Sequence, residues 1–293
     1  MLSVLKRELN EFPQHRLLKK YVHDIHKELE QAHYNKVIEI SFSSIEICRQ
    51  IKEQAVRLKN EEVANSMFVV AEYCKMFKCY SNYWIALMEE RFQDSWVLLQ
   101  DTIDKIINVN KFTENHSAYK IDKFNELFYT LEKLYPYKLF ASIEAVIKTK
   151  ICSICGKNAI GLDCLHITGS LYWGEMANVL CKDIALKAVA IVTHPLDKRC
   201  VMELSDDNRT EAEKFQLLNY FITHNKHPLK IFSVNESEKY FYNDKYENIK
   251  RNDICPCGSN KKFKVCCGTS KYNKGSHYNL NFKEDIELKR VLS

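Results

Sequence analysis

Glycine and proline are scarce in the first half of this chain. All seven glycines lie after residue 155, and the first 150 residues hold only two prolines, Pro13 and Pro136. Both residue types interrupt helices, so a long segment that nearly lacks them and is rich in Leu, Glu, Lys and Ala is typical of helical structure. The absence argues against a turn-rich fold over residues 1–150 and predicts five to seven helices there.

Long apolar runs are also absent. The first residues contain no apolar core of the kind found in signal peptides, and no later stretch approaches the roughly 20 apolar residues that span a bilayer. We therefore expect a cytoplasmic protein. In that reducing compartment the twelve cysteines, several of them closely spaced, are expected to bind metal rather than to form disulfides.

Three familiar catalytic motifs are missing. The sequence contains no glycine-rich phosphate-binding loop, no G-x-S-x-G nucleophile elbow and no H-E-x-x-H helix. His224 and His227 stand at the end of a predicted helix before Pro228, without a nearby cysteine or carboxylate, so a solvated helix end is expected there. Enzyme chemistry has no visible place in the sequence.

Apolar residues in the first 150 positions follow helical spacing. Two windows each place large side chains on one face of a helix. The first window holds Trp96, Leu99, Ile103, Ile106 and Ile107, and the second holds Ile121, Phe124, Leu127, Phe128, Leu131 and Leu134.

Two aromatic segments, at residues 83–87 and 92–96, resemble tetratricopeptide helix pairs. The glycine and alanine positions of that repeat are absent and its period of about 34 residues does not recur, so a plain helical bundle is favoured. Trp84, Trp96 and Tyr135 are then expected to pack between helices.

The composition changes after residue 150. Residues 188–192 and 200–204 are expected to form two strands around a turn at residues 194–197. A short helix near residues 211–223 and a strand at residues 229–234 are expected to follow.

Four cysteines lie close together near the C-terminus. Their pattern is C-x-C-x8-C-C, formed by Cys255, Cys257, Cys266 and Cys267. Four thiolates this close can surround one Zn²⁺ as a tetrahedron if the chain turns tightly after the first pair. Gly258 permits that turn, and Asn260 is the non-glycine residue best able to adopt a left-handed conformation. Phe263 is expected to pack over the sulfurs.

This segment resembles the SEC-C motif, a zinc-binding tail first known from the SecA translocase ATPase and appended to many bacterial proteins. The motif has the pattern C-x-C-G-S-G-K-K-(Y/F)-K-x-C-(C/H). The residues that match it are Cys255, Cys257, Gly258, Ser259, Lys261, Lys262, Phe263, Lys264, Cys266 and Cys267. Asn260 replaces a glycine, which is conservative for the backbone. In the translocase such a tail contacts an acidic chaperone surface and the ribosome, so the resemblance implies a protein or ribosomal partner.

Positive charge is concentrated in the same region. Residues 245–275 carry eight lysines and arginines against two acidic residues, whereas the whole chain carries only +5. One zinc ion with four thiolates adds about −2, so a basic patch of about +4 remains. We expect Lys261, Lys262 and Lys264 to form the partner-binding surface.

A second cluster of cysteine and histidine follows the helical region. Its candidate metal ligands are Cys152, Cys155, Cys164 and His166, with Cys181 in reserve. C-x2-C-G-K is the knuckle that opens treble clefs and zinc ribbons, because its glycine allows a turn that points backbone N–H groups at the sulfurs. Three thiolates and one imidazole make a closed zinc site, which favours a structural role over a catalytic one. The alternative is free thiols beside a hydrogen-bonded histidine.

Two further resemblances concern this second cluster. An uncharacterised family of SEC-C-containing bacterial proteins shares its cysteines, its histidine and the glycines and aromatic residue that follow, but that family implies no activity. The matching residues are Cys152, Cys155, Gly156, Cys164, His166, Ile167, Gly169, Tyr172, Gly174 and Glu175, with Val192 and Pro195 beyond. Residues 163–167 are also faintly similar to the strand of HNH nucleases, although Cys164 stands where that family needs a general-base histidine.

The expected fold class is α+β. The predicted layout is a helical bundle at 1–150, a zinc-ribbon or treble-clef-like α+β domain at 151–235, a linker at 236–253, a zinc knuckle at 254–269 and a partly ordered tail at 270–293. The expected function is a zinc-binding adaptor, with two Zn²⁺ sites, whose basic knuckle docks on a protein or the ribosome. The alternatives are nucleic-acid binding, or less favoured, an HNH-like metal-dependent nuclease. For nucleic-acid binding, aromatic residues between the lysines would stack on bases, namely Tyr246, Phe263, Tyr272 and Tyr278.

Overall fold

The chain forms two compact units, one made of residues up to Ile231 together with Glu284 onwards, and the other of Phe232–Lys283. They are seen in a computed structural model that describes residues 12–203, 209–225, 227–242, 246–270 and 272–288. The start of the chain, Leu204 of a predicted strand, and Lys245 and Lys271 of the basic region lie outside the described residues.

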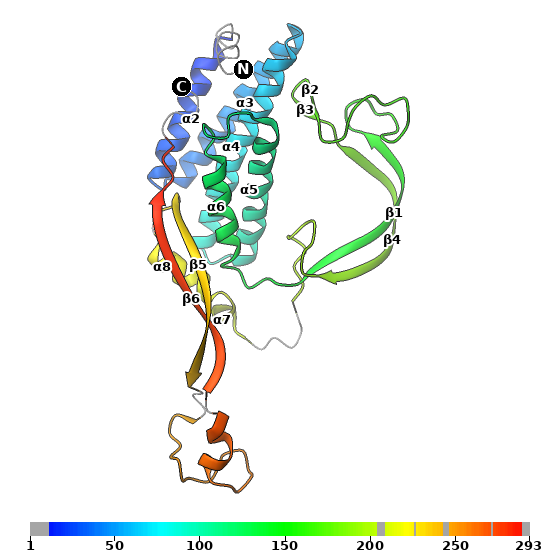
Figure 1. Cartoon of the computed structure of the whole chain (residues 1–293). Coiled ribbons are helices and arrows are strands. Elements are labelled where there is room, and N and C mark those ends of the chain that lie inside the picture. The colour runs from blue at the N-terminus through cyan, green and yellow to red at the C-terminus, as the bar shows by residue number, and fades with distance from the viewer. Residues whose placement is uncertain (1–11, 204–208, 226, 243–245, 271, 289–293) are drawn as a thin grey trace. The chain divides into compact units, whose positions relative to one another are not determined.

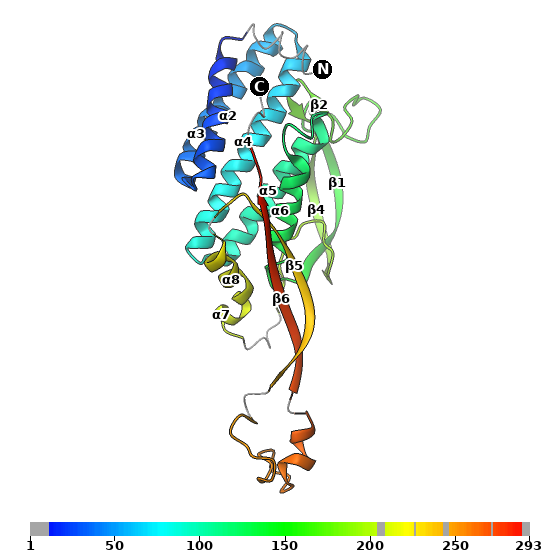
Figure 2. The ribbon, with the colours of Figure 1, turned by 60° about the vertical axis from the view of Figure 1, so that its left-hand side comes forward.

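Five successive helices build the bundle of the first unit (Figures 1 and 2). They are α2 (Gln14–Glu30), α3 (Tyr34–Arg57), α4 (Glu61–Met88), α5 (Phe92–Phe112) and α6 (Ile121–Glu132). Short connections make consecutive helices antiparallel neighbours. The prediction of a helical region is confirmed up to Glu132, and none of the described helices is long and apolar enough to cross a membrane.

Each of the first three connections contains a left-handed residue that is not glycine. Ala32, Lys59 and Glu90 have φ angles of 56°, 56° and 57°. The residue after each one donates its backbone N–H to a carbonyl five residues back, as from His33 to Glu28 at 2.9 Å. This is the Schellman arrangement that normally ends on glycine. The turns between these helices therefore form without glycine.

The core of the bundle lies around α4. Its aromatic side chains Tyr73, Phe77, Tyr80 and Trp84 are buried, with Tyr73 and Phe77 rings 4.7 Å apart. Trp96 and Tyr135 are also buried, as predicted.

Both predicted helix faces lie in this core, with one exception. All six residues of the second window are buried, and so are four of the five in the first. Ile107 is 45% exposed because Ile106 occupies the core-facing position next to it, and adjacent helical residues point about 100° apart.

A long antiparallel ribbon follows the bundle, consisting of β1 (Phe140–Cys152) and β4 (Val179–Val192). We expected helix up to about residue 150, and this was wrong beyond Glu132, because β-branched residues alternate through 143–151 and favour a strand. The strand expected at 188–192 is the end of β4. The strand expected at 200–204 does not form in its described part, where only Val201 makes an isolated bridge to Phe140.

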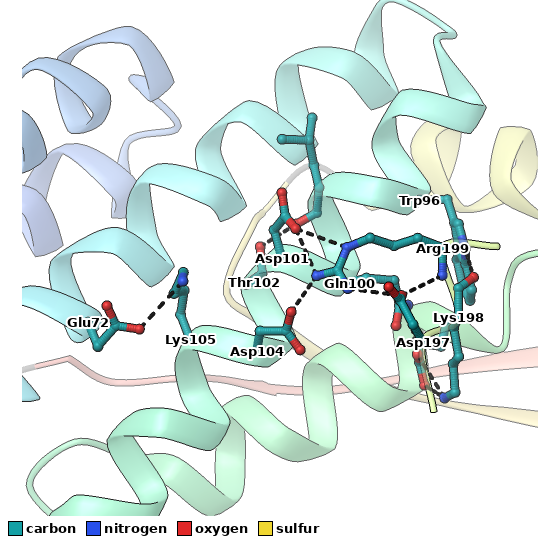
Figure 3. A network of polar contacts seen from close by, with 12 residues as sticks. Glu72, Trp96, Gln100, Asp101, Thr102, Asp104, Lys105, Asp197, Lys198 and Arg199 are labelled. Carbon is teal, nitrogen blue, oxygen red and sulfur yellow. Dashed lines mark hydrogen bonds and ion pairs between the residues drawn. The ribbon is translucent and has the colours of Figure 1, made fainter. Parts of the chain in front are cut away.

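One end of the ribbon is fixed to α5 and α6 by residues 197–199 (Figure 3). The Trp96 indole N–H donates to the carbonyl of Lys198 at 2.7 Å, and the Lys198 ammonium pairs with Glu132 at 2.7 Å. The Arg199 guanidinium bonds to Asp101 at 2.8 Å, to Asp197 at 3.0 Å and to Asp104.

The loop at the other end of the ribbon is fixed to α3 and α4. It contains the short strands β2 (Leu171–Tyr172) and β3 (Glu175–Met176). The Gly174 N–H donates to the Asn65 side chain at 2.7 Å, and Lys52 pairs with Glu175 at 2.9 Å. A Cβ at Gly174, whose φ is 75°, would lie 2.6 Å from the Ala64 carbonyl oxygen, so this contact requires glycine.

Two short helices and a second ribbon complete the fold. The helices are α7 (Glu211–Lys214), which starts with a capping box of Thr210 and Glu213, and α8 (Gln216–His224). They confirm the helix predicted near 211–223. The second ribbon pairs β5 (Lys230–Tyr242) with β6 (Tyr272–Asp285).

The second ribbon differs from the linker and partly ordered tail that we expected at 236–253 and 270–293. Polar residues on β5 find partners on β6: the Ser276 and Tyr278 hydroxyls donate to Glu236 at 2.5 and 3.2 Å. Beyond β6, Ile286 and Leu288 are buried in the first unit. The expectation was wrong because a polar strand is stabilised by a partner distant in sequence, which local composition does not reveal.

Candidate metal centres

The four cysteines of the C-terminal cluster converge within the second unit. The four Sγ atoms of Cys255, Cys257, Cys266 and Cys267 all lie within 4.8 Å of one another, and those of Cys257 and Cys266 are 3.5 Å apart. A tetrahedron with metal–sulfur bonds of about 2.3 Å has edges of about 3.8 Å. The spacing of the thiols therefore fits one tetrahedral metal ion without rearrangement of the chain.

A tight backbone turn brings the two pairs of cysteines together. Gly258 and Asn260 have φ angles of 78° and 53°, so both predicted left-handed positions are confirmed. The Cys255 N–H donates to the Lys261 carbonyl at 2.7 Å and closes the turn. Hydrogen bonds from Ser259, first from its side chain and then from its backbone, lower the pKa of Cys257 to about 6, which favours the thiolate that a metal requires.

Phe263 forms the small core of this cluster. It begins the short helix η2 (Phe263–Val265), is buried, and packs against the ring of Tyr246 with centroids 5.0 Å apart. A second short helix, η3 (Cys267–Ser270), follows. A Cβ at Gly268 would lie 2.5 Å from the Phe263 carbonyl oxygen, so the chain passes too close for a larger residue.

The central cluster is equally compact. One ligand atom each from Cys152, Cys155, Cys164 and His166 lies within 4.8 Å of the others. The Cys155 and Cys164 sulfurs are 3.7 Å apart, and the Cys164 sulfur lies 3.9 Å from His166 Nδ1. Cys152 ends β1, so the ribbon presents the first ligand and the loop before β4 presents the other three.

The expected knuckle turn is present in the central cluster. Gly156 has a φ of 72° and donates its N–H to the Cys152 carbonyl at 2.9 Å. The backbone N–H of Cys155 lowers the pKa of the Cys152 thiol. The turn therefore directs a backbone donor at the sulfur, as the sequence C-x2-C-G predicts.

Cys181, the reserve ligand, is not part of the described metal-binding group. It lies on β4 opposite Lys150. Glu175, which belongs to the motif around this cluster, pairs with Lys52.

Three residues near the clusters were given no part in a metal site from sequence. Ser259 lies 3.2 Å from the Cys266 sulfur, Tyr246 covers Phe263, and the Tyr172 ring packs edge-on against His166 at 4.6 Å. Ser259 and Tyr172 belong to the motifs quoted for each segment, which was the available signal. Tyr246 lies in the expected linker and was considered there only for stacking on nucleic acid, so its contact with the cluster was not predicted.

The three lysines expected to contact a partner project from the C-terminal cluster. Lys261, Lys262 and Lys264 are all exposed, and no described acidic residue forms an ion pair with them. Their positive charge is therefore available at the surface around the cysteines.

Comparison with known proteins places a SEC-C motif at residues 251–269. The translocase subunit SecA of Sulfurimonas denitrificans is 50% identical over 48 residues, which cover 14% of this chain and 6% of that protein. SecA of Lawsonia intracellularis is 37% identical over 70 residues, covering 24% and 7%. A UPF0225 protein of Enterobacter sp. is 42% identical over 52 residues, covering 16% and 34%.

These similarities concern a small part of each relative, and no solved structure matches the chain significantly. The matched segment coincides with the cysteine cluster of the second unit, whose four thiols fit a tetrahedral ion. Since the sequence motif and the geometry agree there, this chain is a SEC-C-motif-containing protein.

Proposed function

We propose that the chain is a zinc-binding adaptor whose SEC-C knuckle docks on an acidic protein surface. The observation that carries this proposal is the convergence of four thiols around a loop with three exposed lysines, Lys261, Lys262 and Lys264. A metal would fix the loop that presents the lysines, and a rigid charged loop loses less entropy on binding than a flexible one.

Zinc is the metal that the donor sets favour. Four thiolates in the knuckle, and three thiolates with one imidazole in the central cluster, are the typical ligands of structural zinc. Both sets are complete without water. Zinc would therefore stabilise two local folds rather than activate a substrate.

Two alternatives are less well supported. Nucleic-acid binding needs exposed rings for stacking, and Phe263 is buried against Tyr246, which leaves Tyr272 and Tyr278, 52% and 39% exposed, as the accessible rings. An HNH-like nuclease needs a free general-base histidine, whereas His166 lies in the central cluster beside Cys164.

Metal content tests the zinc assignment. Elemental analysis of the purified chain should give two zinc ions, and the double variant Cys255→Ser with Cys257→Ser should give one. The far-ultraviolet circular dichroism of the variant should keep its helical signal, because the helices lie in the other unit. Two zinc ions in that variant would contradict the assignment of the knuckle.

Charge reversal tests the docking surface. A triple variant, Lys261→Glu with Lys262→Glu and Lys264→Glu, should lose partners captured from cell extract. A control with the same change of charge, Arg16→Glu with Lys20→Glu and Lys27→Glu on the exposed side of α2, should keep them. Nuclease treatment should leave the partners bound, and loss of every partner after nuclease would favour nucleic-acid binding instead.

A further inference from the structure

The first ribbon is unusually exposed for its length and composition. Among the described strands β1 and β4 pair only with each other, apart from isolated bridges at the two ends of β1, and almost every residue of β4 is exposed. A two-stranded ribbon is marginally stable by itself and normally packs against a third element. Both ends of this ribbon are bonded to helices, but the strands between those ends have no cover among the described residues.

The pairing register separates the ribbon into an apolar face and a polar face. Directly paired residues lie on the same face, and side chains alternate between faces along a strand. The apolar face is formed by the pairs Ala141–Ile191, Ile143–Val189, Ala145–Leu186 and Ile147–Ile184, and beyond the polar pair Thr149–Lys182 the same face continues with Ile151–Leu180. The opposite face, which we call the polar face, carries Ser142, Glu144, Val146, Lys148 and Lys150 on β1 and the small residues Ala190, Ala188, Ala185 and Cys181 on β4.

The apolar face is large enough to be an interface. Six of its side chains, each 51–65% exposed, together present roughly 600 Å² of apolar surface, the upper range for the largest patch on a typical monomer. The partly exposed Ile147 and Ile151 extend it toward the roughly 800 Å² that each partner contributes to a standard interface.

The shape and charge of this face match a second copy of itself. Along β1 the small residues Ala141 and Ala145 alternate with Ile143 and Ile147, so the face carries both projections and recesses. It holds no charged residue from Ala141 to Ile147 or on their partners, and a copy facing it would therefore bring no like charges together. Two such ribbons packed face to face form a four-stranded sandwich with a two-fold axis.

We propose that this chain is a homodimer in which the apolar faces of the two β1–β4 ribbons pack on each other. The dimer does not depend on the function proposed for the knuckle, which lies in the other unit. In the dimer, the apolar side chains of each ribbon are buried against those of the other copy.

Sedimentation velocity on the zinc-loaded full chain tests the dimer, from about 1 to about 100 μM. The unchanged chain should sediment at twice the chain mass. Ile143→Glu should raise the apparent dissociation constant of the dimer at least about 100-fold, because each copy would bury an unpaired carboxylate. Val146→Glu, on the polar face of the same strand, should remain dimeric.

Circular dichroism and zinc content show whether either variant is misfolded. Both variants should retain the helical signal and the zinc content of the unchanged chain. A chain that stays monomeric throughout the range overturns the proposal, as would occur if its own helices or another protein covered the face. Equal effects of Ile143→Glu and Val146→Glu also overturn it.

Discussion

At the scale of single residues, the scarcity of glycine means that residues with a Cβ occupy left-handed positions in the turns between helices. Ala32, Lys59 and Glu90 adopt left-handed conformations that cost a residue with a Cβ about 1 kcal/mol or more. The helices end at these residues in spite of this cost, because packing of α2 on α3, α3 on α4 and α4 on α5 stabilises the short connections.

Replacing these three residues by glycine should stabilise the bundle. Ala32→Gly, Lys59→Gly and Glu90→Gly should each add about 0.5–1 kcal/mol to the free energy of unfolding, because glycine adopts the left-handed conformation without steric cost. Urea unfolding of the triple variant measures the gain. Gln31→Gly is the matched control: its φ is −93°, so glycine should lower stability there, and an equal gain would contradict the explanation.

A buried histidine should make the stability of the bundle depend on pH. Burial, and next the charge of His23, lower the pKa of His26 to about 3, and its ring packs against Phe77 at 5.3 Å. Below an unfolded pKa of 6.5, the unfolded chain binds a proton that the folded chain does not. The free energy of unfolding should therefore fall by about 2 kcal/mol between about pH 7 and about pH 5 on account of this residue alone.

Comparison with His26→Phe isolates that contribution. The phenylalanine keeps an aromatic ring beside Phe77 and cannot be protonated. Urea unfolding at both pH values should show a loss for the unchanged chain that is larger by about 2 kcal/mol than the loss for the variant. Both proteins share the metal clusters, so their pH dependence cancels. Identical losses would show that His26 is solvated in the folded state.

At the scale of elements, the contacts at 197–199 fix one end of the first ribbon. Arg199→Ala should lower the free energy of unfolding by about 1 kcal/mol, since its three carboxylate partners are partly exposed and screened. Its larger effect should be faster hydrogen exchange at 193–203. Arg91→Ala, which removes pairs only with Glu89 and Asp94 near the start of α5, should leave that exchange unchanged.

Local sequence patterns predicted some elements better than others. The faces of α5 and α6 were predictable because a helix carries its own periodicity, and Gly258 and Asn260 because their conformations are local. The strand predicted at 229–234 ended too early, because in β5 Glu236 is stabilised by Ser276 and Tyr278, 40 and 42 residues away. The cysteine clusters were found because their ligands come in closely spaced pairs beside the left-handed glycines Gly156 and Gly258. The contact of Tyr246 with Phe263 joins residues that are distant in sequence and leaves no such local pattern.

At the scale of the whole molecule, metal removal should affect the clusters and spare the bundle. The helical core around α4 contains neither cluster. A strong chelator should therefore speed hydrogen exchange at 152–176 and 246–269 while the helical dichroism changes little. The bundle should stay folded without metal. A collapse of the helical signal on metal removal would show that a metal site holds the bundle together.

The paired strands β5 and β6 join the knuckle's unit to the other unit at two points, after Ile231 and before Glu284. A tail attached at one point is released by one proteolytic cut, whereas this module stays tethered by the second strand. Tension applied at the knuckle is likewise divided between two strands and does not unzip the hydrogen bonds between them. Attachment through two paired strands thus makes the SEC-C module harder to detach than a tail held at one point.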